Sequence, residues 1–329
     1  MGALLGRSMN NRRKLVIALG AGALTAPFGS FAQQQGKVRR IGLLFIANPE
    51  PSLSLLREGL RELGYLDGKN ILFELRSAAG KPNLLPVLAA ELVRLEVDII
   101  VAFQTPAVRA AKQATNRIPI VMASAGDPVA TGLVASLARP GGNITGMSST
   151  TAELAGKTLE LIREIRPAVK RVAVLANADD PFTKPFLAQI RAAAKNMSIE
   201  LRSIMVRGPE EFDAAFEKWG SERVDAVIVQ PSLPGKHAVE LAVKRRLLLA
   251  SPSRAFAEAG GLFSYTASLK ERLHRVAVFV DKILKGAKPA DLPVEQTTKF
   301  ELVVNMKTAK ALGIKIPDVV LLRVDKVIE

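Results

Sequence analysis

The sequence predicts an α/β fold made of two doubly wound, Rossmann-like lobes joined by a multi-strand hinge. Three observations support this prediction. The chain has 329 residues, which suits two domains of about 150 residues each. Short β-branched runs alternate with helical segments, as in parallel sheets that are covered by helices. The alternation occurs twice, and an amphipathic helix at residues 154–165 separates the two rounds.

The stretch from Asp98 to Pro128 shows the pattern most clearly, as strand, turn, helix, loop, strand and polar turn. The apolar runs at residues 98–103 and 118–123 are typical of strands that are buried on both faces of a parallel sheet. Thr105 supplies an N-cap hydroxyl for the helix expected between them, over residues 107–115.

The other elements of the first lobe follow from the same periodicity. Strands are expected at residues 38–46, 71–75 and 143–147. Helices are expected at residues 53–63 and 84–95, with a short helix beginning at Thr131. In the first of these helices, Leu56, Leu60 and Leu63 repeat at helical spacing and Gly64 ends the pattern.

The second round repeats this architecture without repeating the sequence. Strands are expected at residues 171–176, 199–206, 224–229 and 247–250. Helices are expected to end at Lys195 and Gly261 and to span residues 209–219 and 236–246.

The C-terminal part is expected to cross back and forth between the lobes. It contains a strand at 262–266, a long helix at 268–284, a strand at 300–305, a helical turn at 307–312 and an apolar run at 319–324. The predicted boundaries are residues 38–150 plus 262–285 for lobe 1, and residues 151–261 plus 286–329 for lobe 2.

The N-terminus is typical of a cleaved export signal. Residues 12–14 are basic, residues 15–26 are apolar or small, and residues 30–32 fit a cleavage site. The apolar run is shorter than the roughly 20 residues that span a bilayer. We therefore predict a signal peptide over residues 1–32, cleavage near Ala32 and a periplasmic location. The paired arginines leave both the Sec route and the twin-arginine route open.

Composition excludes several classes of protein. Cysteine is absent, so disulfides, thiolate metal sites and cysteine nucleophiles are excluded. His237 and His274 stand beside basic residues on expected helices, which favours surface positions over metal ligation or catalysis. We expect no metal and no cofactor. Loss of the four basic residues in the signal peptide lowers the net charge from +15 to +11. Basic residues are interleaved with acidic ones, so we expect no nucleic-acid partner.

Polar residues recur where the expected strands end. Thr105 and the Ser124–Asp127 turn follow strands of the first lobe, and Gln230 and Ser251 follow strands of the second. In open parallel sheets, ligands bind outside the carboxyl ends of the strands, near helix N-termini. Each of these residues alone is also typical of a cap or a turn. The recurrence in both lobes is what predicts a binding site.

Several long runs of sequence resemble one family. They are Gly126-Asp127-Pro128, GLVASLARPGGNITG at 132–146, EAGGLFSY at 258–265, the run at 281–317 that begins DKILKGAKPADLP, and RVDKVIE at 323–329. Through them the chain resembles the substrate-binding proteins of ABC transporters, in the type 1 periplasmic binding protein class. Within that class it is similar to the branch that includes tryptophan- and other amino-acid-binding members. The resemblance covers nearly the whole mature chain.

The resemblance implies capture of a small polar solute, an amino acid or a related carboxylate, between the lobes. It further implies closure about the hinge and delivery to a membrane permease by a monomer. The implied ligand contacts are Asn48, Gln104, Thr105, Ser124 and Asp127 in the first lobe, Asn177, Asp179, Gln230, Ser251 and Ser253 in the second, and Tyr265 near the hinge. Thr105, with the amides after it, would hold a carboxylate, and Asp127 or Asp179 would hold an ammonium group.

The chain also departs from these relatives at three places. An Asn177–Pro181 segment replaces an asparagine-proline turn, Ser253 stands where an aromatic residue is common, and Thr266-Ala267 replaces a glycine-proline pair. These departures predict that an aromatic platform is missing, which counts against an aromatic ligand.

The sequence is also compatible with two alternatives to a transport receptor. A periplasmic ligand sensor for a membrane receptor would use the same fold, and fold alone does not fix function. An enzyme is less favoured, because no G-x-G-x-x-G motif follows the first strand. The chain also has no P-loop, no G-x-S-x-G elbow and no histidine near the strand ends. We therefore predict a binding protein that is not an enzyme.

Overall fold

Two sheets organise the part of the chain that the computed structural model describes, which is Gly2 with residues 38–149 and 151–329. Residues 38–329 belong to one unit. The expected signal peptide lies outside the described residues apart from Gly2, so it stays a prediction. None of the described helices combines the length and the apolar character needed to cross a bilayer.

The first sheet has six parallel strands in the order β11-β5-β4-β3-β1-β2. These strands are β1 (Arg39–Phe45), β2 (Ile71–Ser77), β3 (Ile99–Phe103), β4 (Ile120–Gly126), β5 (Ile144–Ser149) and β11 (Glu295–Gln296). Every residue of β3 is buried, as its β-branched sequence predicts for a central strand covered on both faces.

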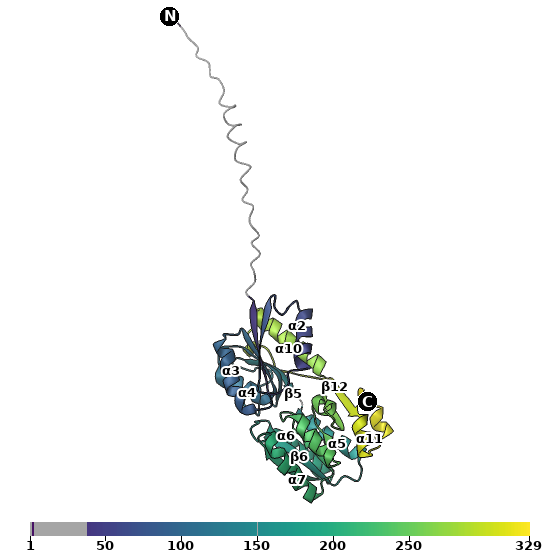
Figure 1. The fold of residues 1–329 in the computed structure, drawn as a ribbon. Coiled ribbons are helices and arrows are strands. Elements are labelled where there is room, and N and C mark those ends of the chain that lie inside the picture. The colour runs from purple at the N-terminus through teal and green to yellow at the C-terminus, as the bar shows by residue number, and fades with distance from the viewer. Residues whose placement is uncertain (1, 3–37, 150) are drawn as a thin grey trace. The chain divides into compact units, whose positions relative to one another are not determined.

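Helices cover both faces of this sheet. On one face lie α3 (Leu85–Arg94), which follows the 3-10 turn η1 (Pro82–Leu84), and α4 (Gln104–Ala114). On the other face lie α2 (Ser52–Glu62) and α10 (Leu269–Leu284). Figure 1 shows α10 beside α2, although the two helices are far apart in the sequence. A C-terminal helix therefore completes the first lobe.

The second sheet has seven strands in the order β13-β12-β10-β9-β8-β6-β7. They are β6 (Arg171–Asn177), β7 (Glu200–Val206), β8 (Ala226–Val229), β9 (Leu248–Ala250), β10 (Phe263–Ala267), β12 (Phe300–Asn305) and β13 (Lys326–Ile328). Neighbouring strands are parallel except β10 and β12, which are antiparallel.

Helices also cover both faces of the second sheet. One core contains residues of α5 (Thr151–Ile165), α6 (Thr183–Asn196), α11 (Met306–Leu312) and α12 (Asp318–Leu321). The opposite core contains residues of α7 (Phe212–Glu222), which follows η2 (Pro209–Glu211), and of α8 (Gly235–Lys244) and α9 (Arg254–Glu258). Trp219 is fully buried in this second core.

The described chain passes between the lobes at three places, which together form the expected multi-strand hinge. The crossings lie between β5 and α5, between β10 and α10, and between β11 and β12. The sequence-based boundaries need correction here. Strand β10 was expected in lobe 1 but lies in the second sheet, because it pairs with β12 and β9. Conversely, β11 was expected in lobe 2 but pairs with β5 in the first sheet.

The short helix expected at Thr131 is absent from the described residues, and hydrogen-bonded turns replace it. Thr131 N donates to Asp127 O, and Leu133 N donates to Pro128 O. Gly132 has φ +69°, a left-handed conformation that interrupts a right-handed helical path. Leu133 is nevertheless buried in the core of the first lobe, so the apolar residues of this segment are used for packing.

Candidate ligand-binding site

A cavity of about 220 Å³ lies at the carboxyl ends of strands from both sheets. Its walls come from the segments after β1, β3 and β4 in the first lobe and after β6 and β8 in the second. Residues at the hinge crossings, among them Ser149, Thr266 and Ala267, also line it. This is the place that the strand-end argument predicts, since parallel strands direct their carboxyl ends to one edge of a sheet.

The structure brings five of the eleven predicted contact residues to this cavity. These are Asn48, Gln104, Thr105, Ser124 and Gln230. Thr105 is buried, and its Oγ1 accepts a hydrogen bond from Gly126 N at 2.9 Å. Helix α4 begins one residue earlier than Thr105, at Gln104, which has φ +70°.

Two further predicted residues are buried supports behind the cavity wall. Ser251 Oγ donates to Val229 O at 2.7 Å. The side-chain amide of Asn177 donates to Ser232 Oγ at 3.3 Å. Neither Ser251 nor Asn177 lines the cavity, but the partner of Asn177, Ser232, does.

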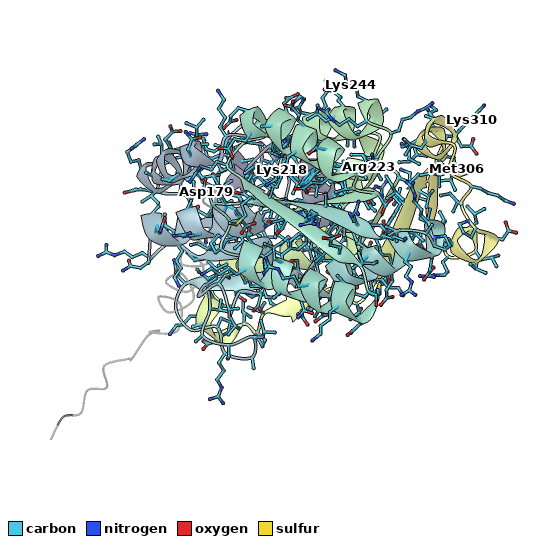
Figure 2. The ribbon with its side chains drawn as sticks, turned by 90° about the horizontal axis from the view of Figure 1, so that it is seen from below. Asp179, Lys218, Arg223, Lys244, Met306 and Lys310 are labelled. Atoms are coloured by element: carbon cyan, nitrogen blue, oxygen red, sulfur yellow. The ribbon has the colours of Figure 1, made fainter. Side chains whose placement is uncertain are left out.

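The other four predicted residues do not line the cavity, although each is adjacent in the sequence to a residue that does. Asp127 is exposed, and its Oδ1 accepts a hydrogen bond from Ala130 N at 3.0 Å, which closes a turn. Ser253 precedes α9, and Tyr265 packs against Phe300 with ring centroids 6.0 Å apart. Asp179 is exposed and is not a lining residue; Figure 2 labels it on the opposite side of the view from Met306 and Lys310, which belong to α11.

Asp180, which is not among the eleven residues predicted from the sequence, is the one carboxylate among the described residues that lines the cavity. It is 5% exposed. Its Oδ1 accepts from Phe182 N at 2.9 Å, and its Oδ2 accepts from Gln230 Nε2 at 2.8 Å. Burial raises the pKa of Asp180 above its ordinary value, while hydrogen bonds from Ser232, Phe182 and Gln230 act in the opposite direction. The nearby charge of Arg109 also lowers this pKa.

Among the described residues, Arg272 is the one cationic side chain that lines the cavity, and it comes from α10 rather than from a strand end. Its Nε is buried and has no hydrogen-bond partner among the described residues. Burial lowers the pKa of Arg272 to about 10, against the attraction of Glu301, so the guanidinium remains charged at neutral pH. A sequence signal for this residue exists: it lies between Leu269 and Leu273 on the apolar side of an amphipathic helix.

Three phenylalanines also line the cavity, which corrects the expectation that an aromatic platform is missing. Phe45 and Phe103 are stacked, with ring centroids 3.9 Å apart and an angle of 18° between the rings. Phe182 joins them from the second lobe. Phe45 and Phe103 end strands β1 and β3, so the aromatic surface comes from strand ends and not from the position of Ser253.

One cluster outside the cavity has metal-ligand chemistry. Ligand atoms of Glu58, Glu62 and His274 lie within 4.8 Å of one another. Lys270 Nζ already lies 3.2 Å from Glu58 Oε1, which places a cation beside the cluster. None of these four residues lines the cavity, so the cluster has no part in the site described above.

Two contacts across the cleft show that the lobes are in a closed arrangement. Gln104 Nε2 in the first lobe donates to Pro231 O in the second at 2.8 Å. Gly126, at the end of β4, faces the ring of Phe182 so closely that an added Cβ would overlap it. Glycine at position 126 therefore allows the second lobe to approach the first.

Together the two wound lobes, the triple crossing and the closed polar cavity define a binding protein that encloses a small ligand between hinged halves. Comparison with known families gives the more specific assignment. Residues 51–328 match the family of ABC transporter substrate binding proteins, and because this match spans most of the chain, the protein belongs to that family.

Relatives of known sequence and structure agree with this assignment. The tyrosine-binding protein of Clostridioides difficile strain R20291 is 26% identical over 289 residues, covering 85% of this chain and 82% of the relative. A Streptococcus pneumoniae ABC domain solved in complex with L-Trp is 29% identical, with a TM-score of 0.80 over 88% of this chain and 99% of that one. A conserved domain protein of Vibrio cholerae is 27% identical, with a TM-score of 0.82 over 88% of this chain and 100% of that one.

The contact of Gly126 with Phe182 leads to a prediction about closure. Gly126→Ala should shift the chain toward an open form, because the new methyl group overlaps the Phe182 ring only when the lobes are closed. Small-angle X-ray scattering should report a larger radius of gyration, with unchanged helical content by circular dichroism.

Gly220→Ala provides the control, since a Cβ at that position meets open space. An unchanged radius of gyration for Gly126→Ala would show that this contact does not limit closure.

The burial of Asp180 leads to a prediction about pH. Its pKa is higher in the folded than in the unfolded chain, so the ionised form of the side chain destabilises the fold and protonation relieves this cost. Asp180→Asn removes that titration. The free energy of unfolding of the wild type, minus that of the variant, should therefore rise as the pH falls through the pKa of Asp180.

Urea denaturation of both proteins across this pH range measures the difference. A difference that is constant with pH would contradict the raised pKa.

Proposed function

We propose that this chain is the exported solute-binding component of an ABC importer, which captures a free amino acid or a related carboxylate and delivers it to a membrane permease. The observation that carries the proposal is a cavity whose polar walls come from both lobes and whose edge is formed by the hinge crossings. A ligand that contacts both lobes stabilises closure by the difference in its affinity for the closed and open forms.

The relatives support an amino acid as the ligand class. One is named as a tyrosine-binding protein, and another was solved with L-Trp. The stacked Phe45 and Phe103 offer a flat apolar surface to a ligand side chain. Aromatic side chains pack favourably on such surfaces, so aromatic amino acids are included in the proposal despite the departures seen in the sequence.

The proposed function also includes export to the periplasm, a permease partner and reversible, non-covalent capture. The basic, apolar and small-residue segments of positions 1–32 support export to the periplasm. We infer that the mature chain acts as a monomer, with a membrane permease as its partner and without a cofactor. Ligand capture is non-covalent and reversible, and no catalysis is included in this function.

A ligand screen tests the capture step. The mature chain is mixed with the twenty amino acids, short carboxylates, sugars and nucleosides, and its melting temperature is measured. An amino acid at 100 times its Kd should stabilise the fold by about 2.7 kcal/mol, which raises the melting temperature by several degrees. Sugars and nucleosides serve as controls of similar size. Failure of every amino acid and carboxylate to stabilise the chain would contradict the proposed ligand class.

Uptake by cells tests the delivery step. Deletion of the gene should abolish high-affinity uptake of the radiolabelled amino acid found in the screen, because capture at low concentration depends on the binding protein. A plasmid copy with the export segment should restore uptake, and a copy without residues 1–32 should not. Unimpaired uptake combined with loss of a ligand-dependent transcriptional response would favour a sensor instead.

A further inference from the structure

We propose that the cavity recognises both charges of a zwitterionic amino acid, with Arg272 as the counter-ion of the α-carboxylate and Asp180 as the acceptor for the α-ammonium group. This inference rests on the proposed function and deepens it by assigning the two charged contacts. It also replaces the pair expected from the sequence, in which Thr105 bound the carboxylate and Asp127 or Asp179 bound the ammonium group.

The lining of the cavity carries two opposite charges. Of the described residues that line it, only Arg272 and Asp180 carry a charge. No ion pair within the described part of the chain joins the two. Each charge is therefore available to a ligand, and together they complement one positive and one negative group.

Arg272 has the properties of an anion site. Among the described residues, no side chain accepts a hydrogen bond from its guanidinium, and its Nε is buried. Glu301, the carboxylate that acts on it electrostatically, lies 3.5 Å from Arg254 and is shared with that residue. A guanidinium fork matches a carboxylate with two parallel hydrogen bonds, so an α-carboxylate would satisfy donors that the protein leaves unused.

Asp180 has spare capacity for a donor. An ionised carboxylate offers about four lone-pair sites. Phe182 N, Gln230 Nε2 and the Ser232 side chain occupy three of them. An ammonium group can take the remaining site, where it would also offset the desolvation of the buried carboxylate. The hydrogen bonds from the protein fix the direction in which that site points.

The two residues belong to different halves of the molecule. Arg272 lies on α10, which packs on the first sheet and is held there by a hydrogen bond from Tyr65 Oη to Asp281 Oδ1 at 2.9 Å. Asp180 follows β6 in the second sheet. An amino acid that contacts both charges therefore connects the two lobes. A ligand with only one charged group forms an ion pair with only one lobe.

The experiment combines variants with matched ligands. Isothermal titration calorimetry measures the affinity of L-tryptophan, L-tyrosine and L-leucine, each compared with its amide and with its deaminated acid. The wild type should lose about 10- to 100-fold in affinity on each change, as expected for one charge-assisted hydrogen bond or bidentate pair.

The variants should respond selectively to the two ligand changes. Arg272→Gln should weaken binding of the amino acid and abolish the difference between acid and amide, while the loss on deamination remains. Asp180→Asn should do the reverse. Arg117→Gln and Asp213→Asn, both exposed and outside the cavity, are the matched controls and should behave as the wild type.

The outcomes separate this assignment from the proposed function. If each variant weakens all three ligand forms equally, the residues shape the cavity without contacting the charges, and the assignment is wrong while the amino-acid function stands. Equal wild-type affinity for acid and amide would overturn the role of Arg272. If neither an amino acid nor a related carboxylate binds the wild type in calorimetry or in the thermal screen, the proposed function itself fails. Circular dichroism of each ligand-free variant confirms that it is folded.

Discussion

Parallel strand pairing is the constraint on which the arrangement of this site depends. Parallel neighbours need a crossover on the face of the sheet, so their carboxyl ends collect at one edge together with the N-termini of the following helices. Here this happens in two sheets whose strand ends line the same cavity. The three crossings keep the carboxyl-end edges of the two sheets facing one another. Because only these three backbone segments join the lobes, the lobes can still rotate relative to each other.

The cavity buries two ionisable groups, Arg272 and Asp180, and this burial is costly for the empty protein. The guanidinium of Arg272 has a buried and unpartnered Nε, and Asp180 is an almost fully buried carboxylate. Removing charged groups from water destabilises a fold unless partners replace the lost hydration. A ligand that supplies these partners replaces the lost hydrogen bonds, and this replacement contributes to the free energy of ligand binding. The same desolvation therefore lowers the stability of the ligand-free protein and strengthens the electrostatic interactions that a ligand makes in the cavity.

The sequence predicted the two wound lobes, the crossings and the edge of the sheets where the cavity lies. Those features depend on periodicity and on strand ends, which are local in the sequence. It did not predict that Arg272 enters the cavity, because α10 begins in a hinge crossing and packs on a sheet built from the other end of the chain. Strand β10 was placed in the wrong lobe for a similar reason, since its partner β12 is distant in sequence. Strands β11 and β13 have only two or three residues, too few to show a period.

The choice between Asp179 and Asp180 shows how finely local geometry decides the site. Asn177 Oδ1 accepts a hydrogen bond from Asp179 N at 3.0 Å, an Asx turn that changes the direction of the chain after β6. Asp179 is left exposed and Asp180 is buried.

A comparable turn explains Asp127, whose φ of +36° and bond from Ala130 N direct the side chain into the turn instead of the cavity. Gln104 has φ +70° yet does line the cavity. Such left-handed residues cost about 1–3 kcal/mol each unless the surroundings hold them. At Gln104 the bond to Pro231 O depends on lobe closure, so the same event that encloses a ligand also stabilises the strained first residue of α4.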